Sequence, residues 1–249
     1  GIFMPVETEL WPNFLRAIRE RHIPVMMVNG RISEKSVKTY RYLYGIWDDM
    51  LSTVSRFCMQ SSIDADYIYS LGADKNKIFV TGNTKFDQTY AEVTSEDYAR
   101  YKEELGLNDS YPIIMAGSTH PGEEKALFDA FKKVREKYAD ARLVIAPRKT
   151  NRADEISKLA SSYGYETGYR SKMLENSNLR KAYPVVLLDT IGELGRIYAV
   201  GDVVFVGGSL CKTGGHNVLE PAAHAKPIIV GPNMQNFKDS YSLLSKVGA

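Results

Sequence analysis

A glycine-rich loop between an apolar run and a helix carries the clearest chemistry in this sequence. Residues 203–206 read Val-Val-Phe-Val, residues 207–209 read Gly-Gly-Ser, and residues 213–217 lead into a helix that begins Asn-Val-Leu-Glu-Pro. Glycines let backbone N–H groups approach an anion closely, and the positive end of the following helix points at the same place. The loop therefore predicts a site for the phosphate of a nucleotide.

Glu220 lies in the first turn of that predicted helix. A carboxylate carries only acceptors, so it could accept hydrogen bonds from the two hydroxyls of a ribose. The alternative is a capping box, in which Asn217 caps the helix and Glu220 reaches back to its backbone. The two interpretations are compatible, and the local residues favour neither.

The composition is that of a soluble globular protein. The 249 residues carry 32 Lys and Arg against 30 Asp and Glu, a net charge of +2, so we expect no nucleic-acid partner. Cys58 and Cys211 are far apart, which fits a reducing compartment better than a disulfide framework. No apolar run is long enough to span a bilayer, and the four histidines show no zinc spacing.

The elements that position the loop follow a repeated pattern of a short apolar run and then a helical segment. Continuous apolar runs separated in this way predict parallel strands covered on both faces, an α/β fold, with ligands collecting at the carboxyl ends of the strands. The runs occupy residues 2–4, 25–28, 57–59, 78–80, 113–115, 143–145, 185–188, 203–206 and 228–230.

A helix predicted over about 95–105, closed by Gly106, precedes a polar stretch and marks our domain boundary. Residues 1–92 are expected to form the C-terminal part of one domain, 93–110 an inter-domain linker, and 111–249 a second domain. The aperiodic stretch 170–182 is expected to be a surface excursion or a short helix.

Five segments, in order, resemble the lipid A-specific 3-deoxy-D-manno-octulosonic acid (Kdo) transferase family. They are residues 7–13 (Glu-Thr-Glu-Leu-Trp-Pro-Asn), 28–33 (Val-Asn-Gly-Arg-Ile-Ser), 81–87 (Thr-Gly-Asn-Thr-Lys-Phe-Asp), 117–124 (Gly-Ser-Thr-His-Pro-Gly-Glu-Glu) and 214–221 (Gly-Gly-His-Asn-Val-Leu-Glu-Pro). The resemblance implies a GT-B glycosyltransferase with two Rossmann-like domains whose parallel sheets face a cleft. It implies transfer of Kdo from CMP-Kdo to a lipid A precursor, lipid IVA, in lipopolysaccharide core biosynthesis. This reaction takes place on the cytoplasmic face of the bacterial inner membrane, with no cofactor or metal expected.

In that reaction, negative charge builds on the departing CMP phosphate, and helix amino ends and cations must stabilise it. Gly214, Gly215 and Asn217 suit the first role. Arg148 suits the second because a guanidinium offers paired donors, although it could also be an ordinary surface arginine. The family usually continues after this arginine with His-Pro-Glu-Arg, whereas residues 149–152 here are Lys-Thr-Asn-Arg.

Ser118 and Thr119 open another strand-to-helix turn and could bind the donor's phosphate or carboxylate. Helix capping, with Glu123 and Glu124 in the first turn, is the locally favoured alternative. His120 and His216 lie in loops on the same rim, where they could contact a ligand or only fix a loop.

On the acceptor side the resemblance favours Glu9, in acceptor handling or in holding the architecture of the site. Arg31 and Lys85 are cations on the same rim that could meet an acceptor phosphate or the donor carboxylate, or form solvated salt bridges. The family's general base lies upstream of residue 1, so it is not expected in this chain. The chain looks truncated at both ends, with an incomplete N-terminal domain and without the last helices of the second.

Two other functions remain open. A different GT-B enzyme that uses a UDP-sugar would share the sheet, the glycine loop and the ribose carboxylate. A non-catalytic nucleotide-binding fragment would also fit a chain without its general base. Binding of CMP compared with UDP separates the first alternative from a Kdo transferase.

Overall fold

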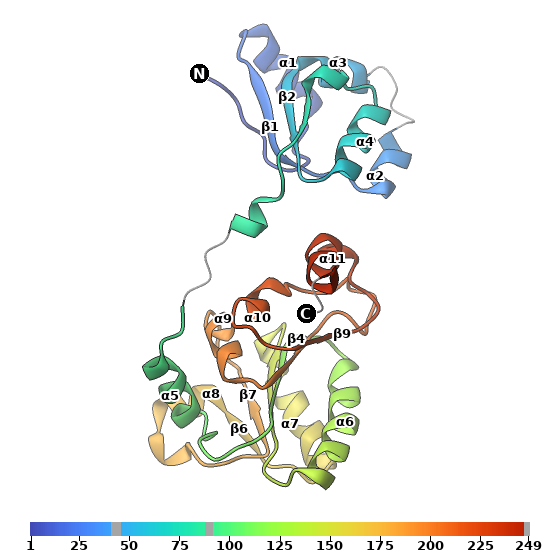
Figure 1. The fold of residues 1–249 in the computed structure, drawn as a ribbon. Coiled ribbons are helices and arrows are strands. Elements are labelled where there is room, and N and C mark those ends of the chain that lie inside the picture. Colours follow the sequence, from blue (N-terminus) through green and yellow to red (C-terminus); the bar gives the residue numbers. More distant parts are fainter. Residues whose placement is uncertain (41–45, 88–91, 247–249) are drawn as a thin grey trace. The chain divides into compact units, whose positions relative to one another are not determined.

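A computed structural model of the chain describes residues 1–40, 46–87 and 92–246. The chain forms two compact units, Gly1–Thr89 and Tyr90–Ala249, each with its own sheet (Figure 1). Every strand pair that the structure describes in either sheet is parallel. The predicted α/β class with parallel sheets is therefore confirmed.

The first unit contains a three-stranded sheet in the order β1-β2-β3. Residues 2–4, predicted as a strand, form an isolated bridge from Phe3 to Val25 of β1, and Val6 forms a second one to Val28. Val25, Met27 and Phe57 are fully buried in its core. The described elements are α1 (Pro12–Glu20), β1 (Val25–Gly30), α2 (Glu34–Tyr40), α3 (Ile46–Thr53), β2 (Val54–Met59), α4 (Ser62–Ser70), η2 (Lys75–Lys77), β3 (Ile78–Val80) and η3 (Thr84–Asp87).

The second unit contains a six-stranded sheet in the order β6-β7-β5-β4-β8-β9. Its first half contains α5 (Ser95–Glu104), β4 (Ile113–Thr119), α6 (Glu123–Lys137), β5 (Arg142–Pro147), η4 (Thr150–Arg152), α7 (Ala153–Ser162), β6 (Thr167–Tyr169) and α8 (Arg170–Glu175). Its second half contains η5 (Ser177–Leu179), β7 (Val185–Leu187), α9 (Leu194–Ile197), η6 (Tyr198–Val200), β8 (Val203–Val206), α10 (Leu219–Ala222), β9 (Ile228–Val230), η7 (Gln235–Phe237) and α11 (Lys238–Lys246).

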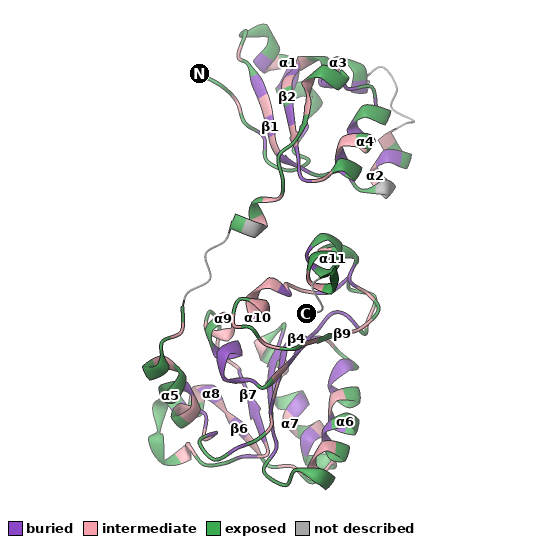
Figure 2. Ribbon diagram, in the orientation of Figure 1, coloured by how far each residue is buried: buried purple, intermediate pink, exposed green. Residues whose placement is uncertain are grey.

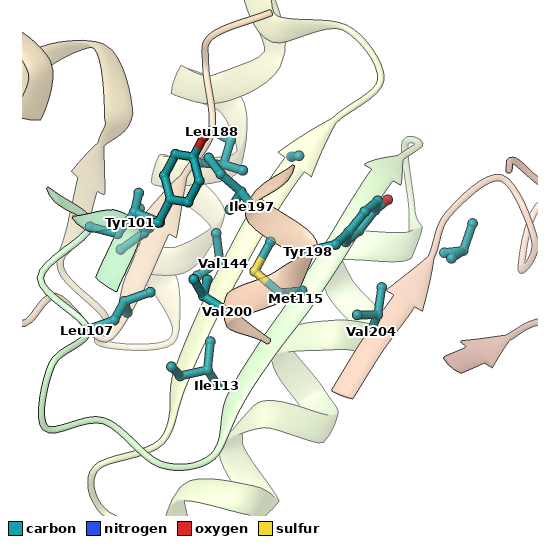
Figure 3. Close-up of a cluster of buried hydrophobic side chains, with 14 of the residues drawn as sticks. Tyr101, Leu107, Ile113, Met115, Val144, Leu188, Ile197, Tyr198, Val200 and Val204 are labelled. Atoms are coloured by element: carbon teal, nitrogen blue, oxygen red, sulfur yellow. The ribbon is translucent and has the colours of Figure 1, made fainter. Parts of the chain in front are cut away.

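Side chains are buried on both faces of this sheet. Successive residues of a strand point to opposite faces, so one strand contributes to two clusters. Ile145 of β5 packs in one cluster with Phe128 of α6, whereas its neighbour Val144 belongs to a second cluster on the other face. Figure 2 shows the central strands buried, and Figure 3 shows Met115 and Val144 on neighbouring strands beneath Ile197 and Tyr198. Continuous apolar runs on the central strands follow from this two-sided burial.

Residues 93–110, expected to be a linker, contain α5 and belong to the second unit. The helix begins after a capping box made by Thr94 and Asp97, close to its predicted start. Tyr101 and Leu105 are buried in the core of the second unit, so this helix is part of the fold.

Candidate functional site

The carboxyl ends of β4 and β8 meet at the topological switch point of the second sheet. From β4 the chain proceeds to β5 on one side of the sheet, and it later returns to β8 on the other. In open α/β sheets ligands bind at such a point. The two strand ends are closely joined here, because the Gly207 N–H donates to the Gly117 carbonyl at 2.8 Å. A Cβ at position 207 would lie 2.4 Å from the Ser118 carbonyl oxygen, so only glycine fits.

The backbone amides of residues 208–210 already bind an anion, the carboxylate of Glu123. One oxygen accepts from the N–H groups of Ser209 and Leu210 at 3.0 and 2.9 Å, and the other accepts from Gly208 and His120, both at 2.8 Å. Glu123 is 1% exposed and lies at the start of α6, where the helix dipole favours a negative charge. The first part of the glycine loop is therefore held by an internal carboxylate and is not open to a phosphate.

Glu124 makes a second internal link beside the first. It accepts from the Thr119 hydroxyl at 2.8 Å and from the Arg152 guanidinium at 2.7 and 3.3 Å. Burial by itself lowers the pKa of Arg152, but its hydrogen bonds to Glu124 and Glu155 outweigh burial and raise it. Thr119 is fully buried, so its hydroxyl is turned to Glu124 and not to a ligand. Thr119 does not cap α6, whose N-cap residue is Gly122, and its hydroxyl makes a structural contact in place of the predicted donor contact.

Ser118 differs from its neighbour because it is partly exposed and adopts a left-handed backbone, with φ of 55°. The register between β4 and β5 shifts between Gly117 and Thr119, which places Ser118 in an irregularity at the strand end. Strained residues of this kind concentrate at ligand sites. Ser118 therefore remains a candidate donor contact.

The second part of the glycine loop has its own close packing. Gly214 and Gly215 have φ values of 101° and 78°, and a Cβ on either would lie about 2.5 Å or less from Asn236 or Met234. The Gly215 N–H donates to the Gly208 carbonyl at 2.8 Å, so this amide serves the loop itself. Among the described residues, the amides of Gly214 and His216 donate to no other group of the chain.

Asn217 and Glu220 are brought together at the start of α10. The Asn217 side-chain oxygen accepts from the Leu219 N–H at 3.0 Å, and its Nδ2 donates to Glu220 Oε1 at 3.2 Å. The predicted capping box is therefore not formed, because the N-cap residue of α10 is Val218 and Glu220 meets the Asn217 side chain and not its backbone. The other oxygen, Oε2, lies over Gly195, where a Cβ would be 3.7 Å away.

Arg148 and the two loop histidines stand around the same switch point. The Arg148 N–H donates to the Thr119 carbonyl at 3.0 Å, and its side chain is exposed. The Nε2 atoms of His120 and His216 are 2.8 Å apart. Burial, followed by the nearby His120 and Arg148, lowers the pKa of His216. The structure thus collects Ser118, Arg148 and both histidines on one rim.

The predicted acceptor-side residues lie outside the strands of the first unit. Glu9 accepts a hydrogen bond from the exposed Trp11 indole at 2.7 Å. Arg31 follows β1 directly and is exposed, and the Ile32 N–H beside it donates to Asp64 at 2.8 Å. Lys85 lies in η3, in a loop held to β1 because Asn29 accepts from the Thr84 N–H at 3.1 Å.

The contacts of Glu123 and Glu124 and the histidine pair are the site features that the sequence did not predict. The Gly-Glu-Glu after a strand-to-helix turn indicated helix capping. Each carboxylate also has distant partners, 85 to 87 residues away for Glu123 and 28 residues away for Glu124. Over residues 1–40, 46–87 and 92–246, no group of three His, Cys, Asp or Glu residues is arranged to hold a metal ion.

Comparison with known proteins shows which family the chain is similar to. A protein-family model described as 3-Deoxy-D-manno-octulosonic-acid transferase (kdotransferase) matches residues 1–88. A 3-deoxy-D-manno-octulosonic acid transferase from Haemophilus influenzae is 34% identical over 245 residues, which cover 97% of this chain and 56% of that protein. A bifunctional glycosyltransferase/methyltransferase from Fusobacterium nucleatum is 36% identical over 237 residues, which cover 94% of this chain and 36% of that protein.

Among solved structures, the C-terminal CMP-Kdo binding domain of WaaA from Acinetobacter baumannii is similar with a TM-score of 0.55. It is 30% identical, and the match covers 62% of this chain and 78% of that one. The curated relatives named above are longer, and this chain spans 36% and 56% of their length.

Two parallel α/β units with a polar site at a switch point define a Rossmann-like protein of the GT-B type. Within that class, the chain belongs to the 3-deoxy-D-manno-octulosonic acid (Kdo) transferase family.

Proposed function

We propose that this chain is the donor-binding part, with some of the acceptor side, of an enzyme that transfers Kdo from CMP-Kdo to a lipid A precursor. The observation that carries the proposal is the 30% identity to a solved CMP-Kdo binding domain, of which the match covers 78%. The similarity to a Kdo transferase over 97% of the chain supports the same conclusion.

The donor's phosphate is assigned to the rim between β4 and β8. Arg148 supplies a cation with paired donors, and the amides of Gly214 and His216 supply backbone N–H groups. Gly215 contributes by its backbone conformation, since its own amide is bound to Gly208. The interaction of these groups with the phosphate strengthens as negative charge builds on it in the transition state. A preformed site lowers the activation barrier in this way.

The donor's ribose is assigned to Glu220. Its Oε1 is fixed by Asn217, which leaves Oε2 over the bare backbone of Gly195 as an acceptor for ribose hydroxyls. Ser118 completes the proposed donor contacts, whereas Thr119 positions the turn through Glu124.

The acceptor is assigned to the first unit, with Glu9, Arg31 and Lys85 as the proposed contacts for its sugar and phosphate groups. No residue of the chain is assigned as the general base. Because the proposed acceptor is a lipid, we place the protein at the cytoplasmic face of the inner membrane as a peripheral protein. No helix within the described residues is long and apolar enough to cross a membrane.

Calorimetry with CMP and UMP tests the donor assignment. We expect CMP to bind and UMP to bind at least tenfold more weakly, because the family uses a cytidine nucleotide. Equal or better binding of UMP would favour a UDP-sugar enzyme. Incubation with CMP-Kdo and tetraacylated lipid A precursor tests transfer, and mass spectrometry should find a Kdo-bearing lipid together with released CMP. Release of CMP without such a lipid would contradict the proposed activity.

A further inference from the structure

Arg170 is a buried cation that the proposed donor contacts do not use. It is the first residue of α8 and is 2% exposed. Its Nε and Nη2 atoms donate to the Glu193 carboxylate at 3.1 to 3.2 Å, and Nη2 also donates to Glu104 at 2.7 Å. The guanidinium therefore joins the start of α8 to the end of α5 and to the residue that precedes α9.

Glu193 belongs to the loop between β7 and α9, residues 189–193, and helps to hold its shape. It is the N-cap residue of α9, and its carboxylate also accepts a hydrogen bond from the Thr190 hydroxyl. Asp189, at the other end of the loop, accepts from the N–H and the hydroxyl of Ser171 at 2.9 and 2.5 Å. Both ends of the 189–193 loop are therefore fixed by the first two residues of α8.

The segment after this loop forms one wall of the proposed donor site. In α9, a Cβ on Gly195 would lie 3.7 Å from Oε2 of Glu220, the proposed ribose contact. The Gly195 carbonyl accepts from His224 Nε2 at 2.6 Å, which fixes α9 against the residues after α10. The Tyr198 hydroxyl occupies the space beside Gly117 of β4, where a Cβ would overlap it. The segment from α9 to η6 therefore lines the site from the ribose contact to the switch point.

The base of a bound nucleotide lies beyond its ribose, on the side away from the phosphate. With the phosphate beside Arg148 and the ribose on Glu220, the wall continues from α9 into the 189–193 loop, which directly precedes it. In this loop Ile191 is 89% exposed and Gly192 has a φ of 92°, so an apolar side chain and bare backbone stand at the rim. Backbone N–H and C=O groups can distinguish the amino group of cytosine from the carbonyl group of uracil.

We propose that Arg170 is a positioning residue for recognition of the donor's base, and that it acts by holding the 189–193 loop through Glu193. This inference rests on the proposed function, because it takes a cytidine nucleotide as the ligand. Arg170 is too deeply buried to contact the nucleotide itself. Without its fork of donors, the loop loses the fixed shape in which its backbone meets the base. The proposed phosphate and ribose contacts come from other segments and stay in place.

The two carboxylates bound to Arg170 provide a matched pair of variants. Glu193→Gln weakens the link from Arg170 to the 189–193 loop, whereas Glu104→Gln weakens the link to α5 and leaves the loop contacts in place. The two carboxylate side chains are 21% and 18% exposed, so both variants remove a similarly buried negative charge from the same guanidinium. A purely structural effect of the ion cluster is therefore expected from both variants alike.

Two substitutions of Arg170 itself complete the set. Arg170→Met removes the charge and the donors together. Arg170→Lys keeps a buried positive charge but lacks the planar fork that binds Glu193, so it tests the loop even where Arg170→Met fails to fold. Circular dichroism and thermal unfolding show which variants are folded.

The test is calorimetry of CMP, UMP and ribose 5-phosphate binding to wild type and to each variant. Ribose 5-phosphate carries the phosphate and the sugar hydroxyls without the base. We expect wild type and Glu104→Gln to prefer CMP over UMP by at least about tenfold. In Arg170→Met, Arg170→Lys and Glu193→Gln this preference should fall to about threefold or less, the loss of one or two hydrogen bonds to the base. The affinity for ribose 5-phosphate should stay within about threefold of wild type in every variant.

Three results would contradict the inference. An undiminished preference for CMP in the folded Arg170 and Glu193 variants would overturn it while leaving the proposed function intact. An equal loss of preference in Glu104→Gln, or an equal loss of ribose 5-phosphate affinity, would do the same, because either shows a general loosening of the second unit. Failure of the wild type to bind CMP, or to prefer it over UMP, would overturn both the inference and the proposed function.

Discussion

Replacement of Glu123 by Gln should loosen the glycine loop without unfolding the chain. The carboxylate accepts four backbone N–H groups, from His120, Gly208, Ser209 and Leu210. Gln keeps one oxygen and presents an NH₂ group in place of the other. Two N–H donors would then face another donor in a buried site.

The cost follows from these contacts. A buried donor without a partner costs roughly 1–3 kcal/mol, so two such donors, with some water entering the loop, cost about 2–4 kcal/mol. A free energy of this size corresponds to a roughly 30- to 900-fold change in a local opening equilibrium. The effect should be confined to the turn before α6 and the 208–210 segment.

Hydrogen exchange of the backbone amides measures that opening directly. In Glu123→Gln the amides of residues 120 and 208–210 should exchange faster by the factor given above, whereas the matched control Glu136→Gln, an exposed position of the same helix, should change nothing. Both tryptophans, Trp11 and Trp47, lie in the first unit, so tryptophan fluorescence provides an internal control that should stay as in wild type. Exchange at residues 208–210 within threefold of wild type would refute the reasoning.

Three further substitutions test the site and its packing. Arg148→Ala should weaken CMP binding by about tenfold or more, and Arg148→Lys should recover only part of the lost affinity, since lysine lacks the paired donors. Equal calorimetric affinities for wild type and Arg148→Ala would show that the arginine does not contact the nucleotide. Wild type should prefer CMP over 2′,3′-dideoxy-CMP by about tenfold, and Glu220→Gln should lose most of that preference; an unchanged preference would disprove the ribose assignment. Gly207→Ala places a Cβ 2.4 Å from the Ser118 carbonyl oxygen and should destabilise the second unit by about 1–3 kcal/mol. A thermal unfolding midpoint equal to that of wild type would show that the ends of β4 and β8 can move apart to accommodate the Cβ.

Much of the fold could be predicted because burial on both faces leaves a plain signal in the sequence. The apolar runs at 113–115, 143–145 and 203–206 coincide with the central strands β4, β5 and β8. The run at 228–230 coincides with β9, an edge strand whose Ile229 is exposed. The missed strand β6 (Thr167–Tyr169) has no apolar run, and it lies at the sheet edge, where one side of its backbone needs no partner strand. Its Gly168 has no room for a Cβ because Met173 and Tyr183 pack against it, a tertiary contact that no local pattern records.

The candidate site could be located from the sequence, but its internal partners could not. Glycines and polar residues after strands mark the rim, and the structure places Arg148 and the glycine loop there. That Glu123 would occupy the amides of 208–210 depends on a contact across 85 or more residues, which only the sheet order brings about. The same holds for the His120–His216 pair, which joins loops 96 positions apart.

The most direct measurement of the central claim is a crystal structure of the chain with CMP. We expect the phosphate to lie beside Arg148 and the amides of Gly214 and His216, with the ribose hydroxyls on Glu220 and the Glu123 carboxylate still bound to residues 208–210. A nucleotide bound elsewhere in the chain, or a phosphate that displaces Glu123 from these amides, would contradict the account.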